Sequence, residues 1–452
     1  MAGVATDELG ANDPTEQCFG EDVMVAIRRR DFLYGASASG LVGLSPRGGR
    51  AQELSKKYAG TTLNILTRAT SAFEATIQIG PEFTEATGIK LQYTRVAPGD
   101  QYQKLMLDLT SGTQSFDVSL FVYQWKYEIA PYLADLSTLE KDVPDTPPLA
   151  LDDYPPKLVE IYGKVDNRLI GLPILGDVAF ILWNKDAYKS QGFDSETGPK
   201  SWQDLVERGR KLTTGKQFGY GLPAGKAIQC AVTWTLLYYG FGGRFFDKAG
   251  RPDLGGEAAI KTMQFMANEL QPIAPPGNLA WDYNEMLTGF QTGQTAQTLM
   301  WPGGFGNLSD PTKSAVAGKY GMTPPPGGAL LGGTSIGVAA KSRNPEAARL
   351  YVAWLTSAAI ARKTALGGTP PARISLFKDP ELVQRHPHYP TVLAALTGET
   401  FGYIPMKEAE QVHIMMYDEA NAACAKLKSP EQAAADLQSK AVAFMTRRGY
   451  LR

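Results

Sequence analysis

Side chains that bind hydroxyl groups, together with large aromatic rings, follow several segments that have the pattern of β-strands. Arg68 and Thr70 follow the apolar segment 62–67, and Trp301 and Gly303 stand at the end of the segment 295–301. A guanidinium group and a hydroxyl group hydrogen-bond to hydroxyls, an indole ring stacks on an apolar sugar face, and glycine admits a ligand close to the backbone. These residue types favour the binding of a small polyhydroxy compound. A solvated turn around Arg68 and a buried packing role for Trp301 are the alternatives.

Signatures of catalysis and of metal binding are weak in this sequence. His386 and His388 form a pair without the further cysteines or histidines that a zinc site requires. The segment 219–227 resembles a phosphate-binding loop, but Tyr220 replaces its first glycine and Ala227 replaces the serine or threonine after the lysine. We therefore expect no metal, no cofactor and no enzymatic activity. An exported enzyme that processes saccharides through a carboxylate pair is the alternative.

Length and composition are those of an ordinary globular protein. The chain has 452 residues, of which 43% are apolar and 20% charged, and its formal net charge is −1. This length suffices for two lobes with separate buried cores. Because there is no basic excess, we expect no nucleic acid and no anionic membrane as partner. We expect a monomer whose partner is a small polar ligand.

The beginning of the chain has the pattern of a removable export signal. The segment 29–33 reads Arg-Arg-Asp-Phe-Leu and fits the core of a twin-arginine signal, and a short apolar segment follows at 33–44. We therefore predict a signal peptide at 1–51 and a periplasmic mature protein. A chance cluster of arginines in a surface helix is the alternative. Cys230 and Cys424 would remain in the mature chain, and the sequence does not decide whether they pair.

Short apolar runs alternate with amphipathic helical patterns over the rest of the chain, which is typical of α/β proteins. Strands are expected at 62–67, 89–96, 117–122, 179–183, 295–301 and 335–340, and helices at 72–87, 100–111, 228–239, 256–270, 345–356 and 430–447. Pro81 should kink or split the first helix, and Gly88 should end it. Ser201, followed by Asp204, marks the beginning of another helix.

Seven phrases stand in a characteristic order along the chain. They are Gly-Ile-Lys-Leu at 88–91, Ser-Gly and Phe-Asp-Val within 111–118, Leu-Ala-Asp-Leu at 133–136, Gly-Leu-Pro and Leu-Trp-Asn-Lys-Asp within 171–186, Ser-Trp-Gln-Asp-Leu at 201–205, Phe-Gln-Thr-Gly-Gln-Thr-Ala at 290–296, and Lys-Ser-Arg-Asn-Pro-Glu-Ala-Ala at 341–348. Together they resemble the extracellular solute-binding proteins of family 1, the maltose-binding type. Trp183 replaces the usual tyrosine and Gln297 stands where methionine is common, which leaves the ligand open.

The resemblance implies an α/β fold of the two-lobed periplasmic-binding-protein type (type II), with a ligand cleft between lobes that are joined by crossing hinge strands. It assigns 52–174 and 332–375 to lobe I, and 175–331 and 376–452 to lobe II. The crossings are expected near 173–177, 324–333 and 370–375.

The resemblance also implies further residues in the cleft. Tyr123 and Trp125 lie in a loop that supplies ligand contacts, Asp177 is a carboxylate that bonds ligand hydroxyls, and Arg373 occupies a Pro-x-Arg position that reaches the ligand. Gly333 would present a backbone donor. Packing beneath the lobe, a hinge role for Asp177 and a surface ion pair for Arg373 are the alternatives.

By resemblance, then, this is the periplasmic substrate-binding component of an ABC importer. It would close around a sugar or polyol and deliver it to an ABC permease in the inner membrane. An organic anion, a peptide or a polyamine is the alternative ligand, because Arg68 and Arg373 also suit a carboxylate.

Overall fold

The computed structural model describes residues 54–113 and 115–451, so the expected export signal at 1–51 lies outside the described residues. A first sheet has the strand order β2-β1-β3-β11-β6. Its strands are β1 (Thr62–Arg68), β2 (Lys90–Val96), β3 (Val118–Val122), β6 (Leu172–Leu175) and β11 (Thr334–Val338). β1 is parallel to β2 and β3, whereas β11 is antiparallel to β3 and β6. The sheet therefore joins segments that lie far apart in the sequence.

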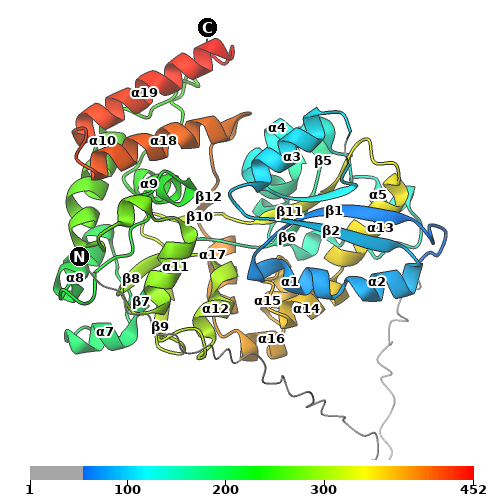
Figure 1. Cartoon of the computed structure of the whole chain (residues 1–452), viewed down its shortest axis with the longest axis horizontal. Coiled ribbons are helices and arrows are strands. Elements are labelled where there is room, and N and C mark those ends of the chain that lie inside the picture. Colours follow the sequence, from blue (N-terminus) through cyan, green and yellow to red (C-terminus); the bar gives the residue numbers. More distant parts are fainter. Residues whose placement is uncertain (1–53, 114, 452) are drawn as a thin grey trace, which may run out of the picture. The chain divides into compact units, whose positions relative to one another are not determined.

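Helices cover the first sheet on both sides. They include α1 (Ser71–Gln78), α2 (Gly80–Thr87), α3 (Gln101–Thr110), α4 (Lys126–Ile129), α13 (Pro345–Thr356) and α14 (Ala358–Leu366). Figure 1 shows α3 and α4 on one side of the sheet and α1 and α2 on the other. The predicted split at Pro81 is confirmed, because Pro81 lies in the first turn of α2, where a missing N–H costs no hydrogen bond. Gly88 ends α2 in the left-handed conformation, as predicted.

A second sheet has the order β8-β7-β9, with β7 antiparallel to both neighbours. Its strands are β7 (Phe180–Asn184), β8 (Gln297–Met300) and β9 (Tyr320–Thr323), and the main helices of this part are α7 (Lys185–Ser190), α8 (Trp202–Leu212), α9 (Ile228–Gly240), α10 (Glu257–Gln264), α11 (Tyr283–Gln291), α12 (Phe305–Ser309), α18 (Ala409–Cys424) and α19 (Pro430–Arg447). α8 begins as predicted, because the hydroxyl of Ser201 accepts a hydrogen bond of 3.0 Å from the N–H of Asp204.

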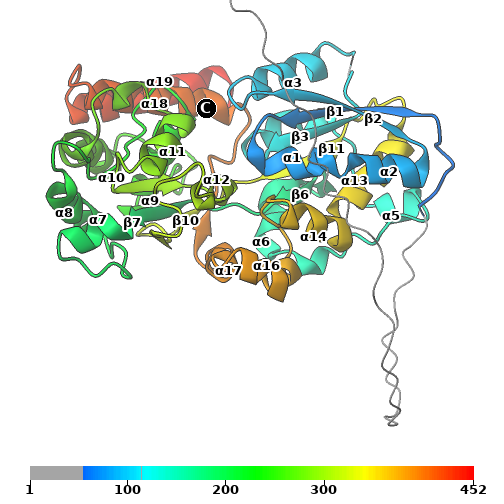
Figure 2. The same ribbon diagram turned by 60° about the horizontal axis from the view of Figure 1, so that its bottom comes forward.

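Helix α9 forms the centre of this second part. Its sequence has no polar face, and it is buried because α10 and α18 pack against it. Figure 2 shows α18 and α19 side by side along one edge. Within the described residues, no helix combines the length and the apolar character that a membrane crossing requires.

Three connections link the two sheets. The first joins β6 to β7, the second joins β10 (Ala329–Leu330) to β11, and the third contains β12 (Thr400–Phe401), which pairs in parallel with β10. Between β11 and β12 lie α15 (Ile374–Phe377), α16 (Pro380–Arg385) and α17 (Tyr389–Thr397), which contact α14 and the short helix α6 (Pro156–Leu158). The segment around Pro371, where a crossing was expected, instead hydrogen-bonds to Gly176 (N···O 3.2 Å).

Candidate ligand-binding site

Arg68 and Asp177 form the charged centre of the candidate site. Arg68 is the last residue of β1, and Asp177 lies in the connection between β6 and β7. The Nε atom of Arg68 and the Oδ1 atom of Asp177 are buried and lack a hydrogen-bond partner, and the two groups interact electrostatically. Buried polar atoms in folded proteins are normally hydrogen-bonded. Two such atoms of complementary charge therefore make this pair the candidate site for a polar ligand.

Burial controls the ionisation of this pair. The exposed fraction of Asp177 is 7%, and burial raises the pKa of its carboxyl group to about 7, because a low-dielectric environment disfavours the charged form. The backbone N–H groups of Val178 and Gly303, and the charge of Arg68, act in the opposite direction. Burial also lowers the pKa of Arg68. At neutral pH the carboxyl group can therefore accept or donate a hydrogen bond.

Aromatic side chains surround the charged pair. Tyr283, at the start of α11, and Tyr403, after β12, both interact electrostatically with Arg68 and Asp177. Trp301 follows β8, is buried, and donates from its indole N–H to the amide oxygen of Gln229 at 3.1 Å. Stacking surfaces and hydroxyl groups thus lie next to the charges.

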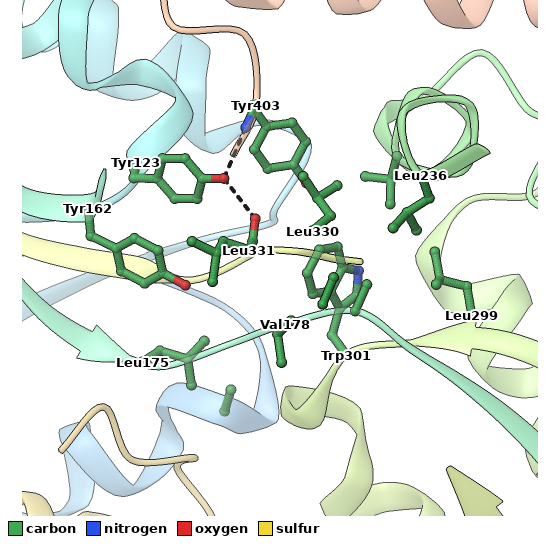
Figure 3. Packing of buried hydrophobic residues seen from close by; sticks show 14 of the residues in the cluster. Tyr123, Tyr162, Leu175, Val178, Leu236, Leu299, Trp301, Leu330, Leu331 and Tyr403 are labelled. Carbon is green, nitrogen blue, oxygen red and sulfur yellow. Dashed lines mark hydrogen bonds between the residues drawn. The ribbon is translucent and has the colours of Figure 1, made fainter. Parts of the chain in front are cut away.

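Tyr123 lies among the three connections rather than on the surface. Its ring stacks on Tyr162 at a centroid distance of 4.9 Å and an interplanar angle of 5°. Its hydroxyl donates to the carbonyl of Leu331 at 2.8 Å and accepts from the backbone N–H of Tyr403 at 3.1 Å (Figure 3). The structure therefore gives Tyr123 a role in holding the connections together.

The two glycines selected from the sequence have different surroundings. A methyl group on Gly303 would lie 3.6 Å from Ala72 Cβ and 3.9 Å from Asp177 Oδ2, so its backbone stands beside the carboxylate. Gly333 has a φ of +100°, and a Cβ atom there would lie 2.2 Å from the ring of Tyr162. Gly333 is thus required by the backbone conformation and by the packing of Tyr162.

Thr70 and Trp125 were also selected from the sequence, and their surroundings differ from those of Arg68 and Asp177. Thr70 is the N-cap residue of α1, two positions after Arg68, and its side chain does not cap the helix. Trp125 packs in a separate apolar cluster beneath the first sheet, and its ring contacts Tyr102 at 5.4 Å. The burial of Trp125 in this cluster matches the packing alternative for that residue.

Arg373 lies outside the cluster around Asp177. Its exposed fraction is 1%, and its guanidinium group is engaged by the protein itself. It donates to the carbonyls of Thr356 (2.7 and 2.9 Å), Leu149 (2.9 Å) and Ala150 (3.2 Å), lies 3.5 Å from Asp153 Oδ2 and stands over the ring of Tyr154 at 4.4 Å. These contacts connect the end of α13 to the segment before α6.

Sequence reasoning did not select Tyr162, Gln229, Tyr283 or Tyr403. For Tyr283 a signal was present, because Asp282 and Glu285 form a capping box that fixes the start of α11 at this tyrosine. The others are brought to the site by pairing between distant segments. No local pattern marks them.

Comparison with known proteins places the chain among binding proteins. The pattern of the bacterial extracellular solute-binding protein family matches residues 68–362. A probable amino-acid ABC transporter periplasmic-binding protein of Sinorhizobium fredii is 52% identical over 94% of this chain and 100% of its own length. The mannitol-binding protein of Pseudomonas aeruginosa is 25% identical over 77% of this chain and 84% of its own.

The fold has counterparts among solved structures. An ABC transporter solute-binding protein of Agrobacterium radiobacter, crystallised with ribitol, superimposes with a TM-score of 0.79 at 24% identity, covering 86% of this chain and 99% of that one. The predicted two-lobed α/β fold of the periplasmic-binding-protein type is therefore confirmed.

Proposed function

Because this chain belongs to the bacterial extracellular solute-binding protein family, we propose that it binds a sugar or polyol between its lobes and delivers it to an ABC permease. Family membership makes it an exported substrate-binding protein of an ABC transporter and not an enzyme. The identity of the ligand and the residues that hold it are the proposed part.

One observation supports the site, namely the unpartnered buried atoms of Arg68 and Asp177. A ligand hydroxyl can accept from the guanidinium group and donate to the carboxylate, so one polyhydroxy compound would satisfy both. The ring of Trp301 and the hydroxyls of Tyr283 and Tyr403 would contact the same ligand. Two of the relatives named above, which bind mannitol and ribitol, support this ligand class.

The proposed mechanism is closure of the lobes around the ligand. Arg68 is carried by the first sheet, and Trp301 follows the second, so a ligand that contacts both favours the closed arrangement. We place lobe I at 54–176 and 333–398, and lobe II at 180–328 and 404–451. This division puts α16 and α17 with α14 and α6, which they contact, and makes β12 the third crossing.

An amino acid is the second candidate ligand. The relative from Sinorhizobium fredii, named as a probable amino-acid-binding protein, supports it. A guanidinium group beside a carboxylate also suits a zwitterion, because Arg68 would bind the carboxylate and Asp177 the ammonium group.

The test is a calorimetric and thermal-shift screen of the purified protein against ribitol, D-mannitol, maltose and the amino acids. A ligand that binds only the folded state raises the melting temperature. A selective polyol or sugar hit that is recovered unchanged supports the proposal, whereas a hit confined to amino acids replaces it with the second candidate. Arg68→Gln should abolish the hit and Asp177→Asn should weaken it, while Arg95→Gln, on the neighbouring strand β2 and exposed, should retain it.

Export is proposed to follow the twin-arginine route, on the basis of the segment 29–33 alone. Replacing Arg29 and Arg30 by lysine should remove the protein from the periplasmic fraction; unchanged export would contradict this route. The mature protein is proposed to be a monomer, which light scattering would check.

A further inference from the structure

The three connections between the lobes are hydrogen-bonded to one another. We call residues 177–179, 329–332 and 399–403 the hinge ribbon. The N–H of Ala179 donates to the carbonyl of Leu330 at 3.0 Å, and the N–H of Leu331 donates to the carbonyl of Phe401 at 2.9 Å. The ribbon therefore responds as a unit when the lobes move.

Two stacked tyrosines contact every strand of the hinge ribbon. The hydroxyl of Tyr162 donates to the carbonyl of Asp177 at 3.0 Å, in the first connection. The hydroxyl of Tyr123 bonds to Leu331 in the second connection and to Tyr403 in the third. Both rings are buried, with exposed fractions of 0% for Tyr162 and 4% for Tyr123. Figure 3 shows the pair and the bonds of Tyr123.

The backbone next to the ribbon is shaped to the same rings. A Cβ atom on Gly333 would overlap the ring of Tyr162 at 2.2 Å, and one on Gly332 would overlap the ring of Trp301 at 2.4 Å. The second connection thus passes between the ring of Tyr162, in the first lobe, and the ring of Trp301, which follows strand β8 of the second sheet. Side chains larger than hydrogen do not fit at either position without displacement of a ring.

We infer that Tyr123 and Tyr162 are positioning residues that clasp the hinge ribbon to the first lobe and hold Asp177 in its binding position. The inference rests on the proposed function, in that Asp177 is taken as a ligand group. Both tyrosines belong to the first lobe, so they fix the end of the hinge ribbon that adjoins this lobe. When the lobes rotate relative to each other, the backbone therefore turns on the side of Val178 and Leu330 that leads to the second lobe.

The experiment measures the distance between the lobes in the full chain without any ligand, so that its outcome does not depend on the ligand class. Spin labels are placed at two exposed positions, Lys104→Cys on α3 and Lys216→Cys after α8, and read by double electron–electron resonance. The native Cys230 and Cys424 are buried. The third native cysteine, Cys18, is replaced by serine in every labelled variant and in the control. The test variants are Tyr123→Phe and Tyr162→Phe.

Tyr220→Phe is the matched control, since Tyr220 is fully buried and its hydroxyl has no partner. Tyr123→Phe leaves the carbonyl of Leu331 and the N–H of Tyr403 without their partner when the hinge ribbon is held against the first lobe. We therefore expect it to change the ratio of interlobe populations by about tenfold or more. Tyr162→Phe should give a smaller change, because the N–H of Gly332 still donates to Asp177. Distance distributions equal to that of the wild type in both variants, or an equal change in the control, would overturn the inference.

Discussion

Replacing Asp177 by asparagine should stabilise the unliganded protein at alkaline pH and leave its stability at acidic pH almost unchanged. The reason is that burial raises the pKa of Asp177 from an ordinary 3.8 to about 7. The unfolded chain loses this proton near pH 4, whereas the folded chain keeps it until about pH 7. Between these values the folded state binds more protons than the unfolded state, so its stability falls as the pH rises.

The size of the effect follows from the same shift. A difference of about three pKa units corresponds to about 4 kcal/mol of unfolding free energy, fully expressed above pH 7 and absent below pH 4. Asparagine has a similar shape and no charge, so it removes this cost of ionisation. The advantage of Asp177→Asn over the wild type should therefore grow by about 4 kcal/mol between pH 4 and pH 8.

Guanidinium chloride unfolding of both proteins at pH 4, 6 and 8 measures this difference. Asp135→Asn is a control of opposite sign, because hydrogen bonds from the N–H groups of Ser137 and Leu169 hold the pKa of Asp135 below its usual value in spite of partial burial. That variant should be less stable than the wild type at pH 6 and 8, and this deficit should shrink only as the pH falls below the ordinary carboxyl pKa near 4. A pH-independent difference between Asp177→Asn and the wild type would refute the reasoning.

Three further predictions concern structural residues. Arg373→Met should lower the unfolding free energy by about 3–5 kcal/mol, since it leaves buried carbonyls unpaired, while calorimetry shows ligand affinity unchanged. Gly333→Ala should lower the melting temperature and the yield of folded protein, because it forces a positive φ and an overlap with Tyr162. His388→Phe should reduce the loss of stability between pH 6 and pH 4, followed by circular dichroism, because burial lowers the pKa of His388 to about 3 and the unfolded chain alone binds this proton in that range.

The secondary structure of the described part was largely predictable, because it depends on local patterns. The apolar run of β1, the break at Pro81 and the cap at Ser201 are set within a few residues of chain. The third crossing was not predictable in this way. β12 has two residues, and it is defined by its pairing with β10, which lies about seventy positions earlier.

The candidate site shows the same limit. Arg68 was selected because it follows an expected strand and Asp177 was selected by resemblance, and in the structure the two groups interact electrostatically. Arg373 was selected by resemblance, yet its donors are held by carbonyls of distant segments. Tyr403 was missed because its place at the site depends on where the third connection crosses.

The ionisation of Asp177 also separates the two candidate ligands. A hydroxyl group both donates and accepts, so a polyol can bond to the carboxylate and, with reversed direction, to the protonated acid. An ammonium group only donates, so an amino acid binds only the carboxylate form.

The two ligand classes therefore differ in the pH dependence of affinity. For an amino acid, the dissociation constant should rise about tenfold for each pH unit below the pKa of about 7, because a proton must first leave Asp177. For a polyol the dependence should be shallow, and Asp177→Asn should retain part of the affinity, since the amide also donates and accepts. Calorimetry at pH 5, 6 and 8 with one polyol and one amino acid decides between a neutral ligand and a zwitterion, whichever compound the screen first detects.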